Sequence, residues 1–525
     1  MNYIPWTIFG VPTILLLQAL AAFILVNGVL QNLIHVFQLV LAWRTLRRQR
    51  RADPTTPLAA WWQLSRNTLP VSILVPAFNE EKTVVDNVRS LLALRYPNFE
   101  IIVINDGSND GTLQRLTTNF GLEPVNRLHE PALPHQAIRG VYGSVRFPHL
   151  TVIDKENGGK ADALNAGINL ARYPLFCAID ADSMLESDAL LRAVQPFVES
   201  PERVVGVGGT VRIANGNRIV GGRVVEAALP RSPLVLVQIV EYLRAFLMAR
   251  VALSEVEALM LISGAFGIFR RAVVIQAGGY SRDTVGEDLE IVVKLHRYLL
   301  DQKIPLEIRF VPEPVCWTQA PTTLGGLMRQ RTRWQRGALE TYFRHIGMFL
   351  RPRYGRAGSL GMSSVLLLDV MGPLIEVLGY LCVPLFWYLG MLNVPYLIAY
   401  LALTFGMGIF ISVGSLVLEE MEMQRFKSAR DLMVLTLAAI FENFGYRQIH
   451  NVWRFIGWIQ FLLGRTHWGT PKRETFDGSD SGGSPGGRRT SARDAATRAA
   501  AIEPPLSAAT AAPGAAAAAP RRSVP

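Results

Sequence analysis

Two carboxylates that follow an apolar run are the first residues of this sequence that could do chemistry. Asp180 and Asp182 come directly after Leu175–Ile179, with a single residue between them. Carboxylate oxygens suit Mg²⁺ or Mn²⁺, and Mg²⁺ usually also binds phosphates and keeps some waters. Asp182 or Ser183 could instead cap a following helix, which is an ordinary use of these residue types. Taken alone, the pair does not decide between a metal site and a helix cap.

Two further polar segments have the composition of a nucleotide site. Asn105, Asp106 and Gly107 end a second apolar run, where an acceptor could read the imide N–H of a base, although Asn-Asp-Gly is also a favourable turn sequence. Lys160 follows two glycines and opens a helical pattern, and an ammonium at a helix N-terminus suits a diphosphate. The alternative is an ordinary loop with a solvated lysine. The spacing of a P-loop is absent.

An acidic pair and a segment with arginine and tryptophan complete the candidate set. Glu287 and Asp288 precede a helical pattern, where they either cap the helix or supply Asp288 as a general base for an attacking hydroxyl. The segment "QRTRWQRG" is predicted to be helical. It could lie on a membrane surface, or its aromatic and cationic groups could stack a sugar ring and hold phosphate.

The elements that must position these residues predict an α/β fold. "VSILVPAFNE", "FEIIVINDGS", "LTVIDKENGG" and "LFCAIDADS" are short β-rich runs that end in polar or glycine residues, and helical stretches separate them. Strands that alternate with helices are typical of a mostly parallel sheet. Ligands of such sheets bind beyond the carboxyl ends of the strands, which is where the candidate residues lie.

Apolar runs on both sides of this segment predict a membrane protein. Half of the residues are hydrophobic, and residues 1–43 carry no acidic or basic side chain before the segment "RTLRRQRR". The positive-inside rule then places the following segment in the cytoplasm. Three apolar runs return later: Ser359–Leu389, Val394–Leu418 and Leu432–Leu463. The last contains polar residues in its middle, so it could form two short crossings, one crossing with an interfacial helix, or a re-entrant pair, for four or five crossings in all.

Charge, cysteines and the C-terminal composition exclude other classes. The net charge of +11 could indicate nucleic acid, but the basic residues cluster beside apolar runs, so we expect membrane lipids and no nucleic acid as partners. The three cysteines lie far apart in apolar settings and fit neither a disulfide framework nor a zinc site, which indicates a cytosolic location. From about Phe476 the chain is rich in Ala, Pro, Gly, Ser and Arg, which predicts disorder.

The order of these motifs resembles that of the membrane-bound family 2 glycosyltransferases, which include cellulose, chitin, hyaluronan and poly-N-acetylglucosamine synthases. The resemblance extends from about Pro70 to Gly337 and rests on seven segments: "PAFNE", "NDG", "GGKADALN", "DAD", "SGAFGIFRR", "GED" and "QRTRW". It implies a GT-A (Rossmann-like) fold on the cytoplasmic face of the cell membrane. The expected regions are an N-terminal transmembrane region at 1–52, the GT-A domain at 53–337, an interfacial helix with C-terminal transmembrane helices at 338–470, and a disordered basic tail at 471–525.

The resemblance also implies a nucleotide-sugar donor, most often a UDP-sugar, and a residue for each part of its site. Glu80 and Asp106 would bind the nucleoside, and Lys160 would bind the diphosphate. Asp180 would contact the donor and share Mg²⁺ or Mn²⁺ with Asp182, the main metal ligand.

On the acceptor side, the "SGAFG" segment around Phe266 would line the site and Asp288 would be the catalytic base, with Glu287 as a substrate-binding neighbour. Three residues would hold the donor pyrophosphate and the acceptor sugar near the mouth of a pore: Gln330, Arg333 and Trp334. A single displacement would invert the anomeric configuration.

The predicted function is elongation of a polysaccharide, coupled to its export. One alternative is a non-processive enzyme that adds one sugar to a lipid acceptor, so the acceptor is either a polysaccharide or a glycolipid. An alternative of another class is a nucleotide-binding transporter or sensor without catalysis. The lack of charge in the first apolar run and the complete set of base, metal and phosphate residues favour an enzyme. The sequence identifies neither the sugar nor any export or regulatory subunit.

Overall fold

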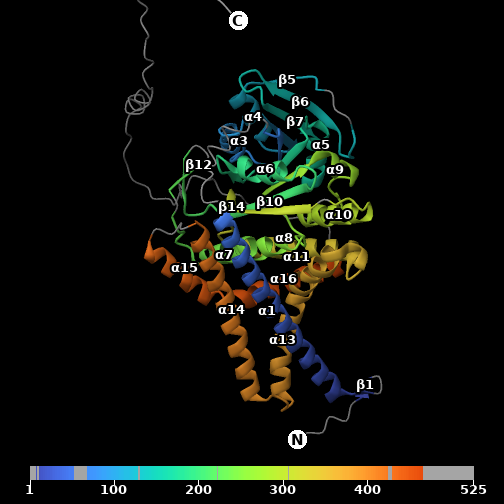
Figure 1. Ribbon diagram of the computed structural model, residues 1–525, viewed down its shortest axis with the longest axis vertical. Helices are drawn as coiled ribbons and strands as arrows, with labels where there is room; N and C mark the ends of the chain where they lie inside the picture. Colours follow the sequence, from blue (N-terminus) through green and yellow to red (C-terminus); the bar gives the residue numbers. More distant parts are fainter. Residues whose placement is uncertain are drawn as a thin grey trace, which may run out of the picture. The chain divides into compact units, whose positions relative to one another are not determined.

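The computed structural model describes residues 7–8, 11–52, 68–127, 131–220, 223–226, 228–305, 307–423 and 428–464. They belong to one compact unit, and the predicted tail at 471–525 lies outside the described residues. Figure 1 shows an α/β part above a group of long helices.

A mixed sheet of ten strands organises the α/β part. Its order is β5-β6-β7-β4-β3-β8-β13-β10-β14-β9. The strands are β3 (Val71–Ala77), β4 (Phe99–Asp106), β5 (Leu122–Pro124), β6 (Ile138–Ser144), β7 (Leu150–Lys155), β8 (Leu175–Ile179), β9 (Met184–Leu185), β10 (Val204–Ile213), β13 (Phe266–Arg270) and β14 (Glu307–Thr318). The expected α/β class is confirmed.

Strand direction divides this sheet. The central strands β7, β4, β3 and β8 are parallel, as the alternation of strands and helices predicts. The strand β13 is antiparallel to both β8 and β10, and β5, β6 and β7 pair antiparallel at the other edge. Two short pairs lie outside the sheet: β1 (Thr7–Ile8) with β2 (Val11–Pro12), and β11 (Arg218–Val220) with β12 (Arg223–Glu226).

Helices cover the sheet because its central strands are apolar on both faces. All eight residues of β4 are buried, as expected for a strand between two helical layers. The helices of this part are α3 (Val84–Leu92), α4 (Thr112–Phe120), α5 (Lys160–Leu170), α6 (Ala189–Glu199), α9 (Arg271–Gln276) and α10 (Glu287–Asp301). Within α5, Gly167 lies so close to the sheet that an added Cβ would be 3.0 Å from Ile104 and 3.2 Å from Leu74. Its lack of a side chain brings α5 against β3 and β4.

Three described helices are long and apolar enough to cross a membrane: Ile14–Gln49, Ala357–Tyr388 and Val394–Met421. The first lies within α1 (Thr13–Ala52), the second includes α13 (Met371–Tyr388), and the third lies within α14 (Val394–Met423). The α/β part therefore lies between apolar helices, as expected, and α1 packs against both α13 and α14.

The expectation of four or five crossings stays a prediction, since three of the described helices are long and apolar enough to span a membrane. The last apolar run divides into α15 (Ala429–Phe441) and α16 (Tyr446–Leu462), and neither is among the helices long and apolar enough to span. The division occurs at Gly445, whose φ of +90° favours glycine. α16 packs against α11 (Leu324–Arg344), where Nε of Arg454 donates to Oε1 of Gln335 at 2.7 Å.

Shorter helices connect the α/β part to the long ones. α7 (Pro233–Leu243), the π-helical segment η1 (Arg244–Arg250) and α8 (Val251–Glu255) follow one another without a break. After α11 come η2 (Ile346–Met348), η3 (Pro352–Tyr354), η4 (Ala357–Gly361), α12 (Met362–Ser364) and η5 (Val365–Val370). Because α11 is continuous from residue 324 to 344, it runs across the domain boundary that the sequence predicts between residues 337 and 338.

Candidate active site

Most of the predicted site residues lie at one edge of the sheet. β3, β4, β7 and β8 run in the same direction, so their carboxyl ends share that edge. Asp106 ends β4, Asp180 follows β8 directly, and the loop after β7 leads to Lys160, the first residue of α5.

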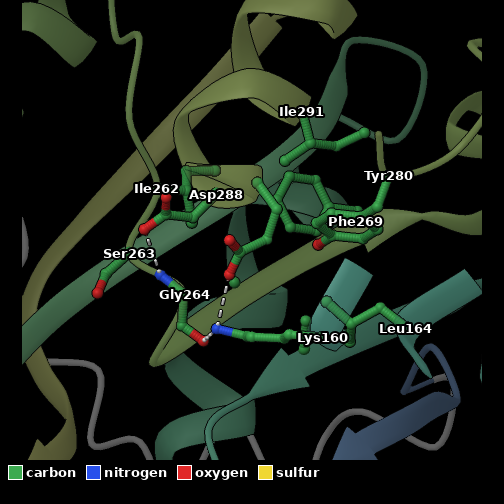
Figure 2. Close-up of a pocket in the computed structure, with 12 residues that line it drawn as sticks. Lys160, Leu164, Ile262, Ser263, Gly264, Phe269, Tyr280, Asp288 and Ile291 are labelled. Atoms are coloured by element: carbon green, nitrogen blue, oxygen red, sulfur yellow. Dashed lines mark hydrogen bonds and ion pairs between the residues drawn. The ribbon is translucent and has the colours of Figure 1, made fainter. Parts of the chain in front are cut away.

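Lys160 joins carboxylates that come from different elements. Its Nζ lies 2.6 Å from Oδ1 of Asp180 and 3.1 Å from Oε1 of Glu287, the first residue of α10. It also donates to the carbonyl oxygen of Gly264 at 3.4 Å (Figure 2). Burial alone would lower the pKa of this lysine, but the charges of Asp180, Glu287 and Asp288 outweigh it and raise the pKa. The ammonium therefore stays charged and ties the end of β8 to the start of α10.

Backbone N–H groups orient Asp288 beside this lysine. Its Oδ2 accepts a hydrogen bond from the N–H of Gly264 at 3.2 Å, and its Oδ1 accepts one from the N–H of Leu289 at 2.9 Å. Burial and the neighbouring charge of Glu287 raise the pKa of Asp288, while Lys160 acts in the opposite direction. A carboxylate with a raised pKa is better matched to proton abstraction near neutral pH than an ordinary aspartate.

A small cavity next to these groups is polar at one end and apolar at the other. Lys160, Glu287 and Asp288 lie at its polar end with Ser263 and Gly264 (Figure 2). Its apolar lining includes Leu164, Ile262, Phe269, Tyr280 and Ile291. Charges beside an apolar wall interact more strongly than they would in water. The arrangement can hold a hydroxyl between a proton acceptor and a cation.

Asp182 completes the acidic pair at the end of β8. Burial and the charge of Asp180 raise its pKa to about 7, whereas Lys160 and Arg333 act in the opposite direction. Arg333 lies on α11, and its effect on Asp182 indicates that the "QRTRW" segment lies near the acidic pair.

The acidic pair suits a hard divalent cation. Two nearby carboxylates oppose each other's ionisation, and the charge of Asp180 adds to burial in raising the pKa of Asp182. A divalent ion between them would relieve it, and oxygen ligands are those that Mg²⁺ and Mn²⁺ favour. Among the described residues there is no group of three or more His, Cys, Asp or Glu side chains arranged to hold a metal ion. Mg²⁺ commonly takes further ligands from substrate phosphates and water.

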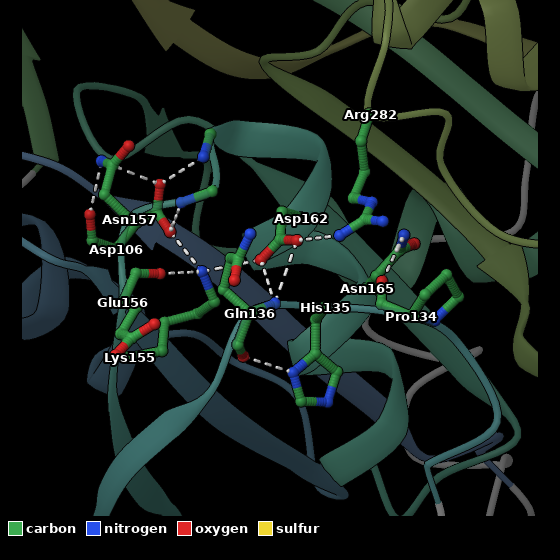
Figure 3. Close-up of polar contacts among 12 residues, drawn as sticks. Asp106, Pro134, His135, Gln136, Lys155, Glu156, Asn157, Asp162, Asn165 and Arg282 are labelled. Carbon is green, nitrogen blue, oxygen red and sulfur yellow. Dashed lines mark hydrogen bonds and ion pairs between the residues drawn. The ribbon is translucent and has the colours of Figure 1, made fainter.

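The carboxylate of Asp106 accepts hydrogen bonds from other residues of the chain (Figure 3). Its Oδ1 accepts from Nζ of Lys155 at 2.5 Å and from the N–H of Gly158 at 3.0 Å. Its Oδ2 accepts from the N–H of Gly159 at 2.8 Å and from Nδ2 of Asn157 at 3.3 Å. These four bonds use its lone-pair positions. In this arrangement Asp106 holds the glycine loop before Lys160, and its role in nucleoside binding stays a prediction.

Two other predicted residues are buried. Glu80 is 2% exposed and its Oε2 accepts from Oγ1 of Thr83 at 2.8 Å, before α3. Phe266 is 0% exposed and pairs with Ile179 across β13 and β8, so its side chain belongs to the core. The expectation that Phe266 lines the acceptor site stays a prediction, although its side chain is buried in this structure.

The predicted residues of α11 lie in different environments. Trp334 is 43% exposed, and the guanidinium of Arg331 lies over its ring at 4.2 Å. Arg331 is itself buried and pairs with Glu241 of α7 at 2.8 Å. Gln330 has a buried Oε1 without a hydrogen-bond partner among the described residues.

Sequence reasoning missed the charged residues that hold this site together. Lys155 is fully buried between Asp106 and Asp162, with Nζ 2.7 Å from Oδ1 of Asp162. Asp162 in turn accepts from Arg282 at 3.0 Å, just ahead of the acidic pair of α10 (Figure 3). A lysine at the end of an apolar strand was the available signal. Its partners are distant in sequence and could not be read from it.

Two family profiles match this chain. "Glycosyl transferase family 2" matches residues 72–276, and "Glycosyl transferase family group 2" matches residues 175–403. The matches overlap and together span more than half of the chain.

Similar proteins include the poly-beta-1,6-N-acetyl-D-glucosamine synthases of two staphylococci. The one from Staphylococcus epidermidis (strain ATCC 35984 / DSM 28319 / BCRC 17069 / CCUG 31568 / BM 3577 / RP62A) is 30% identical over 275 residues, which are 52% of this chain and 56% of that protein. The one from Staphylococcus aureus (strain COL) is 30% identical over 274 residues, with the same coverage. The chain thus spans little more than half the length of these relatives.

Similar solved structures include a mannosyltransferase, PcManGT from Pyrobaculum calidifontis, in complex with GDP-Man and Mn²⁺. It is 16% identical, with a TM-score of 0.46, and the likeness covers 84% of this chain and 100% of that one. Residues 1–349 of S. aureus TarS in complex with UDP-GlcNAc are 13% identical, with a TM-score of 0.37, over 76% of this chain and 93% of that one. By these matches, the part of this chain from residue 72 to residue 403 belongs to the family 2 glycosyltransferases.

Proposed function

We propose that this protein is a membrane GT-A enzyme that transfers a sugar, with inversion, from a UDP-sugar to a growing polysaccharide of the poly-N-acetylglucosamine type. The names of the relatives support the product class, and the three apolar helices support synthesis at a membrane. We place the catalytic part on the cytoplasmic face of the cell membrane, because the arginines after the first apolar run favour that side.

The observation that carries this proposal is the position of Lys160 between two sets of carboxylates. On one side it contacts Asp180, and on the other it contacts Glu287, next to Asp288. A leaving diphosphate needs a cation, and an attacking hydroxyl needs a base. In this arrangement both needs are met within one connected cluster.

The charges of three side chains assign them to the donor and its metal ion. Asp180 and Asp182 would hold Mg²⁺ or Mn²⁺ together with the diphosphate of the donor. When bound, such an ion stabilises the negative charge that develops on the departing nucleoside diphosphate. Lys160 adds a further positive charge at the start of α5, where the helix N-terminus also favours an anion.

On the acceptor side, the reaction needs a base that removes the proton of the attacking hydroxyl. Asp288 takes the proton of the acceptor hydroxyl through an oxygen that the N–H groups of Gly264 and Leu289 keep oriented. The resulting oxygen attacks the anomeric carbon from the face opposite the leaving phosphate. The new bond forms as the old one breaks, so one displacement inverts the configuration.

The test is transfer by membranes that contain the full-length protein. Radiolabelled nucleotide sugars, including UDP-N-acetylglucosamine, are supplied with Mg²⁺, with Mn²⁺ or with a chelator, and the products are sized. We expect long products from a UDP-sugar and none with the chelator. Membranes that contain Asp288→Asn at the same level are the matched control.

Two results would contradict the proposal. A product that consists only of a lipid with one added sugar would favour the non-processive alternative. Binding of nucleotide sugars without transfer from any donor would favour a transporter or sensor.

A further inference from the structure

Arg250 lies in an unusual stretch of helix between the α/β part and the long helices. It ends the π-helical segment η1, which joins α7 to α8. Such segments are rare and occur frequently at functional sites. The guanidinium of Arg250 lies over the ring of Phe246 at 3.9 Å, so the plane of the cation is fixed by an aromatic surface.

Two of the three nitrogen atoms of this guanidinium are buried without a hydrogen-bond partner among the described residues. They are Nε and Nη1 of Arg250. Arg244, in the same segment, donates to Glu442 at 2.5 Å and to Ser412 at 2.9 Å. A buried charged donor without a partner costs free energy, and an unseen ligand is one of the few explanations for it.

The guanidinium of Arg250 and the carboxylate of Asp288 are close enough to interact electrostatically. Burial lowers the pKa of Arg250 to about 10, and Asp288 and Asp369 act on it in the opposite direction. Burial raises the pKa of Tyr242, on which both Arg250 and Asp182 also act. Arg250 therefore lies within electrostatic reach of the base, in the part of the molecule that an acceptor must enter.

We infer that Arg250 binds the acceptor, donating hydrogen bonds from Nε and Nη1 to oxygens of the sugar whose hydroxyl Asp288 deprotonates. The inference rests on the proposed transfer reaction and adds a residue and a ligand class to it. The carboxylates of Asp288 and Asp369 act on this cation and would repel an anion beside it, and Asp369 also pairs with Arg454 at 3.2 Å. Neutral sugar oxygens therefore suit the site better than an anionic acceptor.

The test separates acceptor binding from donor binding. Arg250→Met and Arg250→Lys are compared with the wild type in membranes, with UDP-N-acetylglucosamine as donor and a β-1,6-linked N-acetylglucosamine oligosaccharide as acceptor. We expect Arg250→Met to raise the KM for the acceptor about 10- to 100-fold, because hydrogen bonds from a charged donor are lost. The KM for the donor and the hydrolysis of donor without acceptor should stay within about twofold of wild type.

Two variants serve as controls. Arg250→Lys keeps the charge but cannot supply both donors, so its KM for the acceptor should also rise. Should Arg250→Met not accumulate in membranes, Arg250→Lys decides. Arg203→Met removes an exposed arginine, 3.9 Å from Glu307, and should leave both KM values unchanged.

Results against the role of Arg250 can be told apart from results against the proposed function. An unchanged acceptor KM in Arg250→Lys, or a rise in the donor KM alone, would overturn the role of Arg250. A wild type that transfers no sugar from this donor would count against the proposed function. In that case, direct calorimetric titration of the purified protein with the oligosaccharide still tests the arginine. Binding lost in Arg250→Met supports the inference, and binding that is absent from the wild type or unchanged in the variant contradicts it.

Discussion

Asp180 and Asp182, the acidic pair after β8, carry like charges that repel each other, and a nearby cation relieves this repulsion. Replacing Asp182 by asparagine removes a charge and a ligand at nearly constant volume. We expect Asp182→Asn to abolish transfer while the protein still accumulates in membranes, and added Mg²⁺ or Mn²⁺ should not restore the rate. The measurement is initial rate against metal concentration. Asp86→Asn, at an exposed position on α3, is the control.

Two results would contradict a metal site at Asp180 and Asp182. If Asp182→Asn keeps full activity, or if the wild type transfers sugar equally well in a chelator, the pair holds no metal. Asp182 would then be a structural residue of the turn between β8 and β9.

Asp288 is expected to act on the acceptor and not on the donor. In Asp288→Asn, donor binding should persist while the transfer rate falls about 10²–10⁴-fold, as for the loss of a general base. Titration with the donor and single-turnover rates separate the two effects. Equal losses of donor affinity and of rate would make this residue a donor ligand or a structural cap.

The pH dependence of the wild type provides a second test of Asp288. The base must be ionised, and burial and Glu287 raise its pKa above that of an ordinary aspartate. As the pH falls through this raised pKa, the fraction of ionised base falls and kcat falls with it. The acid limb of the profile should therefore lie above the usual range of aspartate. A rate that stays level down to pH 4 would contradict this reading.

Among the elements, α5 depends on a buried ion network at its N-terminal end. Lys155 is fully buried and pairs with both Asp106 and Asp162. Lys155→Met would leave the buried Asp106 without its cation and Asp162 with Arg282 alone, and we expect a loss of about 3–5 kcal/mol in the free energy of unfolding. Thermal unfolding of the purified protein measures it, and the exposed Lys82→Met is the control. Adding Asp162→Asn to the variant should recover part of the loss.

The helix α11 carries an aromatic side chain with one covered and one available face. Arg331 covers Trp334 on one side, while 43% of the tryptophan remains exposed. Stacking of a sugar on the exposed ring tolerates several orientations. Trp334→Ala should therefore retain single transfer or donor hydrolysis but lose long products, whereas Trp334→Phe should keep some elongation. Product sizing checks this, and long products from Trp334→Ala would show that elongation needs no aromatic surface here.

Local sequence patterns predicted the elements that are set by short-range signals. The strands β3, β4, β7 and β8 end at the polar residues that the sequence marks, and α5 begins at Lys160. The antiparallel partner β13 was not predicted, because strand direction depends on distant pairing. That pairing also buries Phe266. The contacts of Lys155 and Arg331 likewise join residues 49 and 90 positions apart, which no local pattern encodes.

For the molecule as a whole, the number of long apolar helices decides which parts of the chain lie on the same side of the membrane. If α1, α13 and α14 each cross once, their number is odd. The turn at residues 389–393 sends the chain back after α13, so α13 and α14 form a hairpin. Parity then puts residue 13 on one face, and puts the α/β part together with α15 and α16 on the other. The packing of α16 on α11 agrees with that arrangement, since both would lie on the same side.

This parity can be measured without any assay of transfer. A cysteine placed at Asn393, in a protein whose three native cysteines are replaced by serine, should react with an impermeant reagent from the outside of intact cells. A cysteine placed at Gly464 should react only after the cells are opened. Equal labelling of both positions in intact cells would mean that one long helix does not cross. In that case the two ends of the bundle would face the same compartment.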